Sequence, residues 1–148
     1  MQIQINLIKK QLEYITFAYA IAGCSAFNSP LGSWNTSSAI RINAMFRYCS
    51  SFNQPIGNWN TSSVTDMDNV FEQASSFNQD IGGWNTGNVT VSNQGIGKMS
   101  RMFYKATNFN QDLTGWCVTN ITSEPGLFST DSALTNANKP VWGTCPGN

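Results

Sequence analysis

Apolar residues recur in this chain at a spacing that appears four times. In the third copy they are Met67, Val70, Phe71 and Ala74, at positions i, i+3, i+4 and i+7, and Phe77 follows three residues later. This spacing is typical of one face of a short helix. We therefore predict a helix in each copy that is too short to be stable without packing against its neighbours. The equivalent segments begin at Phe17, Ile42 and Met99.

The second part of each copy is a Phe-Asn pair, followed by a Trp seven residues after the Phe. Successive Phe residues are 25, 25 and 32 residues apart. Around the aliphatic residue between Asn and Trp we expect a short strand, and a second short strand near Val64 or Val89. The three signature positions are held by Phe27, Phe52, Phe77 and Phe109, by Asn28, Asn53, Asn78 and Asn110, and by Trp34, Trp59, Trp84 and Trp116.

A period of this length is typical of stacked repeats, in which no unit buries its apolar face alone. It predicts an α/β repeat solenoid with four rungs, each with a short strand and a short helix. Like residues would then form columns of stacked Phe and Trp rings. The Asn column would be a buried ladder that accepts an N–H from one turn and donates to a carbonyl of another. The alternative is that these Asn residues only form turns.

The chain, residues 1–148, is long enough for one domain. Gln2–Leu7 alternates apolar and polar residues, which predicts a strand that covers the first rung. Residues 91–97 are an insertion, which we expect to be a surface loop, either inert or a contact loop. Cys117 and Cys145 bracket a final segment without the repeat pattern, so we predict an irregular C-terminal cap held by their disulfide. The divisions are the N-terminal cap 1–13, the repeats 14–38, 39–63, 64–88 and 89–120, and the C-terminal cap 121–148.

Composition argues against several classes of function. Eight Lys and Arg balance eight Asp and Glu, which gives no basic surplus for nucleic acid. The chain has no His, the usual general base and metal ligand, and no apolar run long enough to span a membrane. Asp80 and Asp112 share a repeat position and could hold Ca²⁺ or act as acid and base, but solvated turn residues are the simpler interpretation. We expect no enzyme and no cofactor.

Two further features leave alternatives open. Cys24 and Cys49 share a repeat position, so they are either two small buried side chains or a disulfide between rungs. Ile21–Cys24 also resembles a bacterial lipoprotein cleavage site, although cleavage there would destroy the first rung. Four Asn-x-Ser/Thr sequons either carry glycans or reflect a turn preference. The sequon residues are Asn35, Asn60, Asn88 and Asn120.

The repeat resembles the BspA-like leucine-rich-repeat group, in particular the 25-residue surface-protein repeat of mycoplasmas, marine bacteria and phages. The resemblance covers residues 17–116 and is most specific from Phe52 to Trp59, Phe77 to Trp84 and Phe109 to Trp116. It implies a leucine-rich-repeat-like fold in a secreted or surface-displayed, non-catalytic protein, often linked to adhesion. It brings no catalytic residues.

These observations predict a non-enzymatic protein at the cell surface, outside the cell or on a virion. It would mediate adhesion, or recognise a protein or a glycan through exposed Asn, Ser, Thr and Tyr side chains. The alternative is a structural subunit that stacks end to end with itself into an extracellular fibril or decorates a virion. Low charge and exposed strand edges favour that alternative. We expect neither a nucleic-acid partner nor a membrane span.

Overall fold

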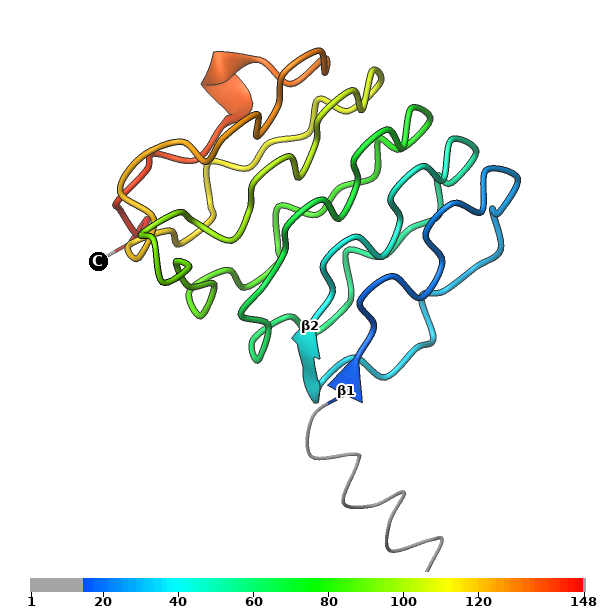
Figure 1. Cartoon of the computed structure of the whole chain (residues 1–148), viewed down its shortest axis with the longest axis horizontal. Coiled ribbons are helices and arrows are strands. Elements are labelled where there is room, and N and C mark those ends of the chain that lie inside the picture. Colours follow the sequence, from blue (N-terminus) through cyan, green and yellow to red (C-terminus); the bar gives the residue numbers. More distant parts are fainter. Residues whose placement is uncertain (1–14, 148) are drawn as a thin grey trace, which may run out of the picture.

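The computed structural model describes residues 15–147. The predicted N-terminal strand Gln2–Leu7 and cap 1–13 lie outside these residues. Figure 1 shows the described chain as a series of similar coils that lie side by side, from the N-terminal coil in blue to the C-terminal coil in orange and red. A coil is here one passage of the chain around the stack.

The predicted α/β repeat solenoid is wrong. Within residues 15–147 the regular elements are β1 (Ile15–Thr16), β2 (Ala39–Arg41) and the short 3₁₀ helix η2 (Asn136–Asn138). Strands β1 and β2 pair in parallel as a two-stranded sheet. The segments predicted as helices are turns, and within residues 15–147 strands occur only in the first two coils. The chain is therefore not a leucine-rich-repeat-like fold with a strand and a helix in each of four rungs.

Pairs of four-residue turns replace the predicted helices. In the second coil the N–H of Met45 donates to the carbonyl of Ile42 (3.1 Å), and that of Cys49 donates to Phe46 (3.0 Å). Each turn is thus closed three residues back instead of four. The third residue of the first turn, Ala44, has a φ of 54°. A positive φ at this position is what a type II turn requires.

The two turns explain why the sequence resembles a helix. The first and last residues of consecutive four-residue turns fall at i, i+3, i+4 and i+7, the same spacing as one helix face. In the second coil these residues are Ile42, Met45, Phe46 and Cys49, and all four are buried. From the second coil to the fifth, each coil has a positive φ at two equivalent positions. The pairs are Ala44 and Tyr48, Asn69 and Gln73, Arg101 and Lys105, and Leu127 and Asp131.

Backbone hydrogen bonds join each pair of turns to the next coil. The N–H groups of Ala44, Phe46 and Tyr48 donate to carbonyls of the third coil at 2.8, 3.0 and 2.8 Å. Alternate N–H groups therefore point along the stack, while those between them close turns within the coil. We call the five equivalent segments the turn ladder. They are residues 17–24, 42–49, 67–74, 99–106 and 125–132.

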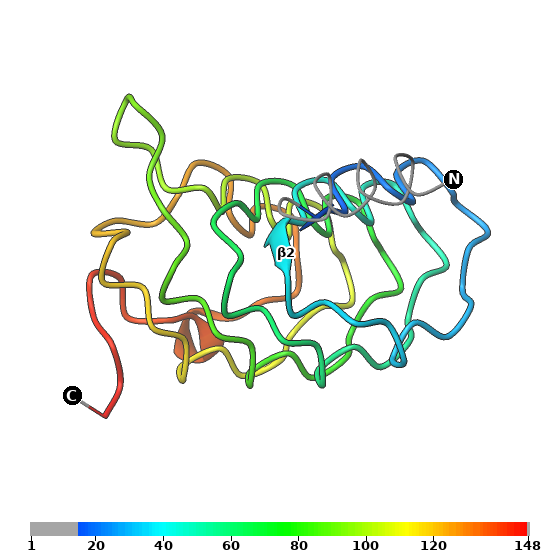
Figure 2. The same ribbon diagram turned by 90° about the horizontal axis from the view of Figure 1, so that it is seen from below.

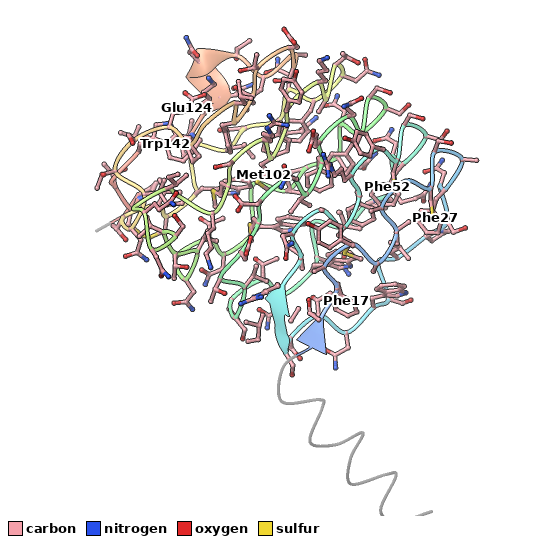
Figure 3. All side chains as sticks on the ribbon, in the orientation of Figure 1. Phe17, Phe27, Phe52, Met102, Glu124 and Trp142 are labelled. Atoms are coloured by element: carbon pink, nitrogen blue, oxygen red, sulfur yellow. A yellow bond between two sulfur atoms is a disulfide. The ribbon has the colours of Figure 1, made fainter. Side chains whose placement is uncertain are left out.

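Aromatic rings fill the space enclosed by the coils. Phe27 and Phe52 lie in neighbouring coils with their ring centres 6.0 Å apart (Figure 3), and the rings of Phe52 and Phe77 are 5.8 Å apart. Trp59 and Trp84 stack at 6.3 Å with their planes 2° apart. Such contacts stabilise by about 0.5–1.5 kcal/mol each beyond the burial of their area.

The C-terminal cap is also more regular than predicted. The N–H groups of Arg101, Phe103 and Lys105 donate to the carbonyls of Gly126, Phe128 and Thr130, at 3.0, 2.8 and 2.9 Å. The turn ladder thus continues into a fifth coil, which corrects the prediction of four rungs. Beyond this coil, Cys145 forms the disulfide with Cys117 that the sequence predicted.

Trp59 and Trp34 provide a matched test of the aromatic core. They hold the same repeat position, but Trp59 is 4% exposed and Trp34 is 39% exposed. Trp59→Ala should lower the free energy of unfolding by about 3–5 kcal/mol, because it empties a filled core position. Trp34→Ala should cost less than about 1.5 kcal/mol, because the Trp34 side chain is already partly exposed to solvent. Urea denaturation measures both, and equal small losses would contradict the stacked core.

Gln73→Gly distinguishes the turns from the predicted helix. Gln73 has a φ of 58°, a conformation that costs a residue with a side chain about 1–2 kcal/mol. Glycine should therefore leave stability unchanged or raise it by up to about 1 kcal/mol, whereas in a helix interior it would cost about 1 kcal/mol. Thermal unfolding of Gln73→Gly beside Gln73→Ala measures the sign of the stability change. A loss of stability in the glycine variant alone would support the predicted helix.

Candidate recognition surface

The Asn series of the signature forms a ladder along the outside of the stack. The side-chain Oδ1 of Asn28 accepts the N–H of Asn53 at 2.9 Å, and the next two steps, to Asn78 and Asn110, measure 3.0 Å. Gln side chains of the following coil donate to the same oxygens. The Asn residues are exposed or half-buried, so the prediction that they are buried is wrong. They hold neighbouring coils together from the rim.

The Trp series makes an equivalent set of bonds from inside the core. The indole N–H of Trp59 donates to the carbonyl of Leu31 at 3.0 Å, and those of Trp84 and Trp116 donate to Ile56 and Ile81 at 3.1 Å. These three Trp side chains therefore reach back to the preceding coil. The signature residues are accounted for by packing and hydrogen bonding between coils.

The side chains of the four sequon residues make hydrogen bonds within the chain. Oδ1 of Asn35 and Oδ1 of Asn60 accept the hydroxyls of the Ser residues two positions later, both at 2.7 Å. The side-chain amides of Asn88 and Asn120 instead donate to carbonyls of the preceding coil. These contacts give all four residues a structural role, within a turn for Asn35 and Asn60 and between coils for Asn88 and Asn120.

Cys24 and Cys49 do not form a disulfide, and they differ in burial. Cys49 is buried, and its thiol donates to the carbonyl of Ile21 at 3.0 Å, while Cys24 is exposed. Burial raises the pKa of the Cys49 thiol to about 11. The prediction of two small buried side chains therefore fits Cys49 and is wrong for Cys24.

Asp80 and Asp112 are used within their own turns. Oδ1 of Asp80 accepts the N–H of Gly82 at 2.9 Å. Oδ1 of Asp112 accepts the hydroxyl of Thr114 at 2.7 Å and its N–H at 2.9 Å, and these bonds hold the pKa of Asp112 below its ordinary value. In residues 15–147 no group of three or more His, Cys, Asp or Glu side chains is placed to hold a metal ion.

The sequence analysis missed a cluster of cationic and aromatic side chains on the turn ladder. The Arg47 guanidinium lies over the ring of Tyr48, 4.6 Å from its centre, and donates to the Tyr48 hydroxyl at 2.8 Å. Two coils further on, Arg101 and Lys105 lie 5.5 and 5.2 Å from the centre of the Tyr104 ring. We call these five residues the Arg–Tyr surface.

Glu72 lies beneath this surface and joins its two halves. Its side chain is 2% exposed, and its carboxylate is 2.8 Å from Arg47 and 3.6 Å from Arg101. A buried carboxylate needs such partners, because an unpaired charge is costly to remove from water. The two arginines are themselves 31% and 46% exposed. They neutralise Glu72 and still present N–H groups to solvent.

A second charged group lies at one edge of the turn ladder. Asp68 accepts the N–H of Ser100 at 2.8 Å, and Asp66 is 3.9 Å from Lys98. Burial, with a smaller contribution from the charge of Asp66, raises the pKa of Asp68 to about 6. Its hydrogen bond from Ser100 and the charge of Lys98 act in the opposite direction. The pKa of Asp68 therefore lies well above the ordinary range of an aspartate.

The insertion 91–97 projects from the stack as a loop (Figure 2). Val91 and Gly97 form an antiparallel bridge at its base, and the N–H of Ser92 donates to the carbonyl of Ile96 at 2.7 Å. Ile96 is 49% exposed. The loop and Lys98 line an open depression of about 360 Å³. None of the helices that the structure describes is long and apolar enough to cross a membrane.

The raised pKa of Asp68 predicts a pH-dependent stability. The folded chain holds this proton more tightly than the unfolded chain, so Asp68 should reduce stability as the pH rises from about 4 to about 6. Asp68→Asn does not ionise and keeps an acceptor for Ser100. The difference in free energy of unfolding between Asp68→Asn and the native chain should therefore shift in favour of the variant across this window and level off above it. Urea denaturation at four pH values tests this, and a pH-independent difference would contradict it.

Comparison with known proteins places the chain in a family. A family model described as "Mycoplasma protein of unknown function, DUF285" matches residues 15–142, which is most of the described chain. No curated protein and no solved structure matches. The match supports a mycoplasma-type repeat family and does not extend to the BspA-like leucine-rich repeats in particular. The chain belongs to the DUF285 family of Mycoplasma proteins of unknown function.

Proposed function

We propose that this protein is a non-enzymatic recognition module outside the cell that binds an anionic glycan through the Arg–Tyr surface. The observation that carries the proposal is the concentration of positive charge on that surface. Between residues 15 and 147 the chain has six Lys and Arg residues, and three of them, Arg47, Arg101 and Lys105, belong to the cluster. The single carboxylate among them, Glu72, is buried. The surface therefore faces solvent with a net positive charge.

The chemistry of the side chains suits such a ligand. Arg binds carboxylate and sulfate-like groups through paired N–H donors, and Tyr offers an apolar ring face together with a hydroxyl. Arg47 is already held by Glu72 and by the hydroxyl of Tyr48. Binding would then lose little side-chain entropy, which favours affinity.

Two observations support a location outside the cell. The Cys117–Cys145 disulfide is typical of proteins from oxidising compartments. The match to the DUF285 family, a mycoplasma-type surface repeat family, agrees with display at a surface. A non-enzymatic role is supported by the carboxylates of Glu72, Asp80 and Asp112, which are engaged in ion pairs or in turns.

Titration with polysaccharides tests the proposal. Isothermal calorimetry should detect binding of a carboxylated polysaccharide such as alginate, weakened by added salt, and no binding of neutral dextran. Arg101→Met and Lys105→Met should each weaken binding about 3- to 10-fold, because each removes one exposed positive charge from the surface. Lys105→Met does so without removing a partner of Glu72. Lys139→Met is the control, since Lys139 pairs with Glu124 and does not belong to the cluster. Equal binding of alginate by all three variants would contradict the proposed surface.

A further inference from the structure

The two ends of the coil stack carry complementary backbone groups. Inside the stack, alternate N–H groups of each turn-ladder segment donate to carbonyls of the following coil. The first coil has no described coil before it, and the fifth has none after it. One end therefore displays carbonyls and the other displays N–H groups.

The fifth coil presents the donors. By their positive φ, Leu127 and Asp131 are the equivalents of Arg101 and Lys105, and Ser129 lies between them as Phe103 does in the fourth coil. The N–H groups of Arg101, Phe103 and Lys105 bond to the fifth coil. Within residues 15–147, the N–H groups of Leu127, Ser129 and Asp131 have no backbone acceptor.

The first coil presents the acceptors. The carbonyls of Asn43, Met45 and Arg47 accept the N–H groups of Tyr19, Ile21 and Gly23, at 3.0, 3.2 and 2.7 Å. The equivalent carbonyls one coil earlier belong to Ala18, Ala20 and Ala22, and no donor within the described chain reaches them. Their side chains are methyl groups, so nothing bulky at these three positions obstructs an approaching coil.

Side chains at the two ends agree with this interpretation. Tyr19 and Trp34 in the first coil are 59% and 39% exposed, and Leu127 and Val141 near the other end are 42% and 65% exposed. In later coils the indole N–H of each Trp donates to the preceding coil. That of Trp34 has no acceptor among the described residues. Apolar side chains and unpaired polar groups thus occur together at the ends.

We propose that copies of this chain stack head to tail, with the fifth coil of one copy against the first coil of the next. The N–H groups of Leu127, Ser129 and Asp131 donate to the carbonyls of Ala18, Ala20 and Ala22 in the register that already joins the fourth and fifth coils. Because the two contacting surfaces differ, the interface does not close on itself and copies add in one direction. A formal net charge of zero allows this association.

A complementation experiment tests the proposal. Ala20→Glu places a charge at the acceptor end, and Leu127→Glu places one at the donor end. Each variant retains one intact end. Light scattering after size exclusion should show concentration-dependent oligomers for the native chain and monomers of 16.3 kDa for each variant alone. An equimolar mixture of the two variants should yield a species of twice that mass. Gly83→Glu, which adds the same charge where a Cβ meets no other atom within 4 Å, should assemble like the native chain.

The other outcomes are decisive as well. A native chain that remains monomeric up to millimolar concentration overturns the proposal. Dimers formed by Leu127→Glu alone indicate an interface between two first coils and overturn it too. An unchanged thermal midpoint in both variants excludes unfolding as the cause of lost assembly. Glycan binding by the Arg–Tyr surface is measured separately, so the failure of one proposal leaves the other standing.

Discussion

The structure depends on the division of backbone hydrogen bonds between two directions. Along the turn ladder, one N–H closes a turn within its coil and the next crosses to the following coil. Buried backbone groups must be paired, so a coil on its own leaves half of these donors unsatisfied. Neighbouring coils are therefore part of the fold of each coil. Within residues 15–147 the same rule leaves carbonyls of the first coil and N–H groups of the fifth without backbone partners.

The side chains follow from the close approach that this bonding imposes. Like residues of adjacent coils lie near one another, which lets Phe rings stack, Asn side chains accept from the next backbone and Trp N–H groups reach back one coil. Glycine is required where coils come closest. A Cβ on Gly82 would lie 2.6 Å from the carbonyl oxygen of Asp112 in the next coil. Any side chain there would push these two coils apart.

The candidate site is a variation in these same columns. Arg47, Glu72 and Tyr104 hold one repeat position in successive coils, and Tyr48, Gln73 and Lys105 hold the next. Charges 25 or more residues apart in sequence therefore meet on one face. The repeat brings these positions together in space, and the charged and aromatic residues that occupy them differ from coil to coil while the backbone follows the same path.

The sequence predicted some of this and misled on the rest. The period identified which residues share a position, and the cysteines bracketing the final segment indicated the disulfide. The helix prediction failed because two four-residue turns place residues such as Ile42 and Phe46 at helical spacing. The fifth coil was missed because it lacks the Phe-Asn and Trp signature. The Arg–Tyr surface was missed because its charges come from different coils and lie far apart in the sequence. They come together only when the coils are stacked, which places Arg47 beside Glu72 and Arg101 in the coil after it.

The turn ladder can be tested most directly by NMR couplings across hydrogen bonds, which identify donor and acceptor without assuming a fold. The nitrogen of Phe71 should couple to the carbonyl carbon of Met102, because its N–H donates to that carbonyl at 2.9 Å. In a helix, the same nitrogen would couple to the carbonyl carbon of Met67, four residues earlier. A coupling to Met102 is the result this structure predicts, and a coupling to Met67 would contradict it.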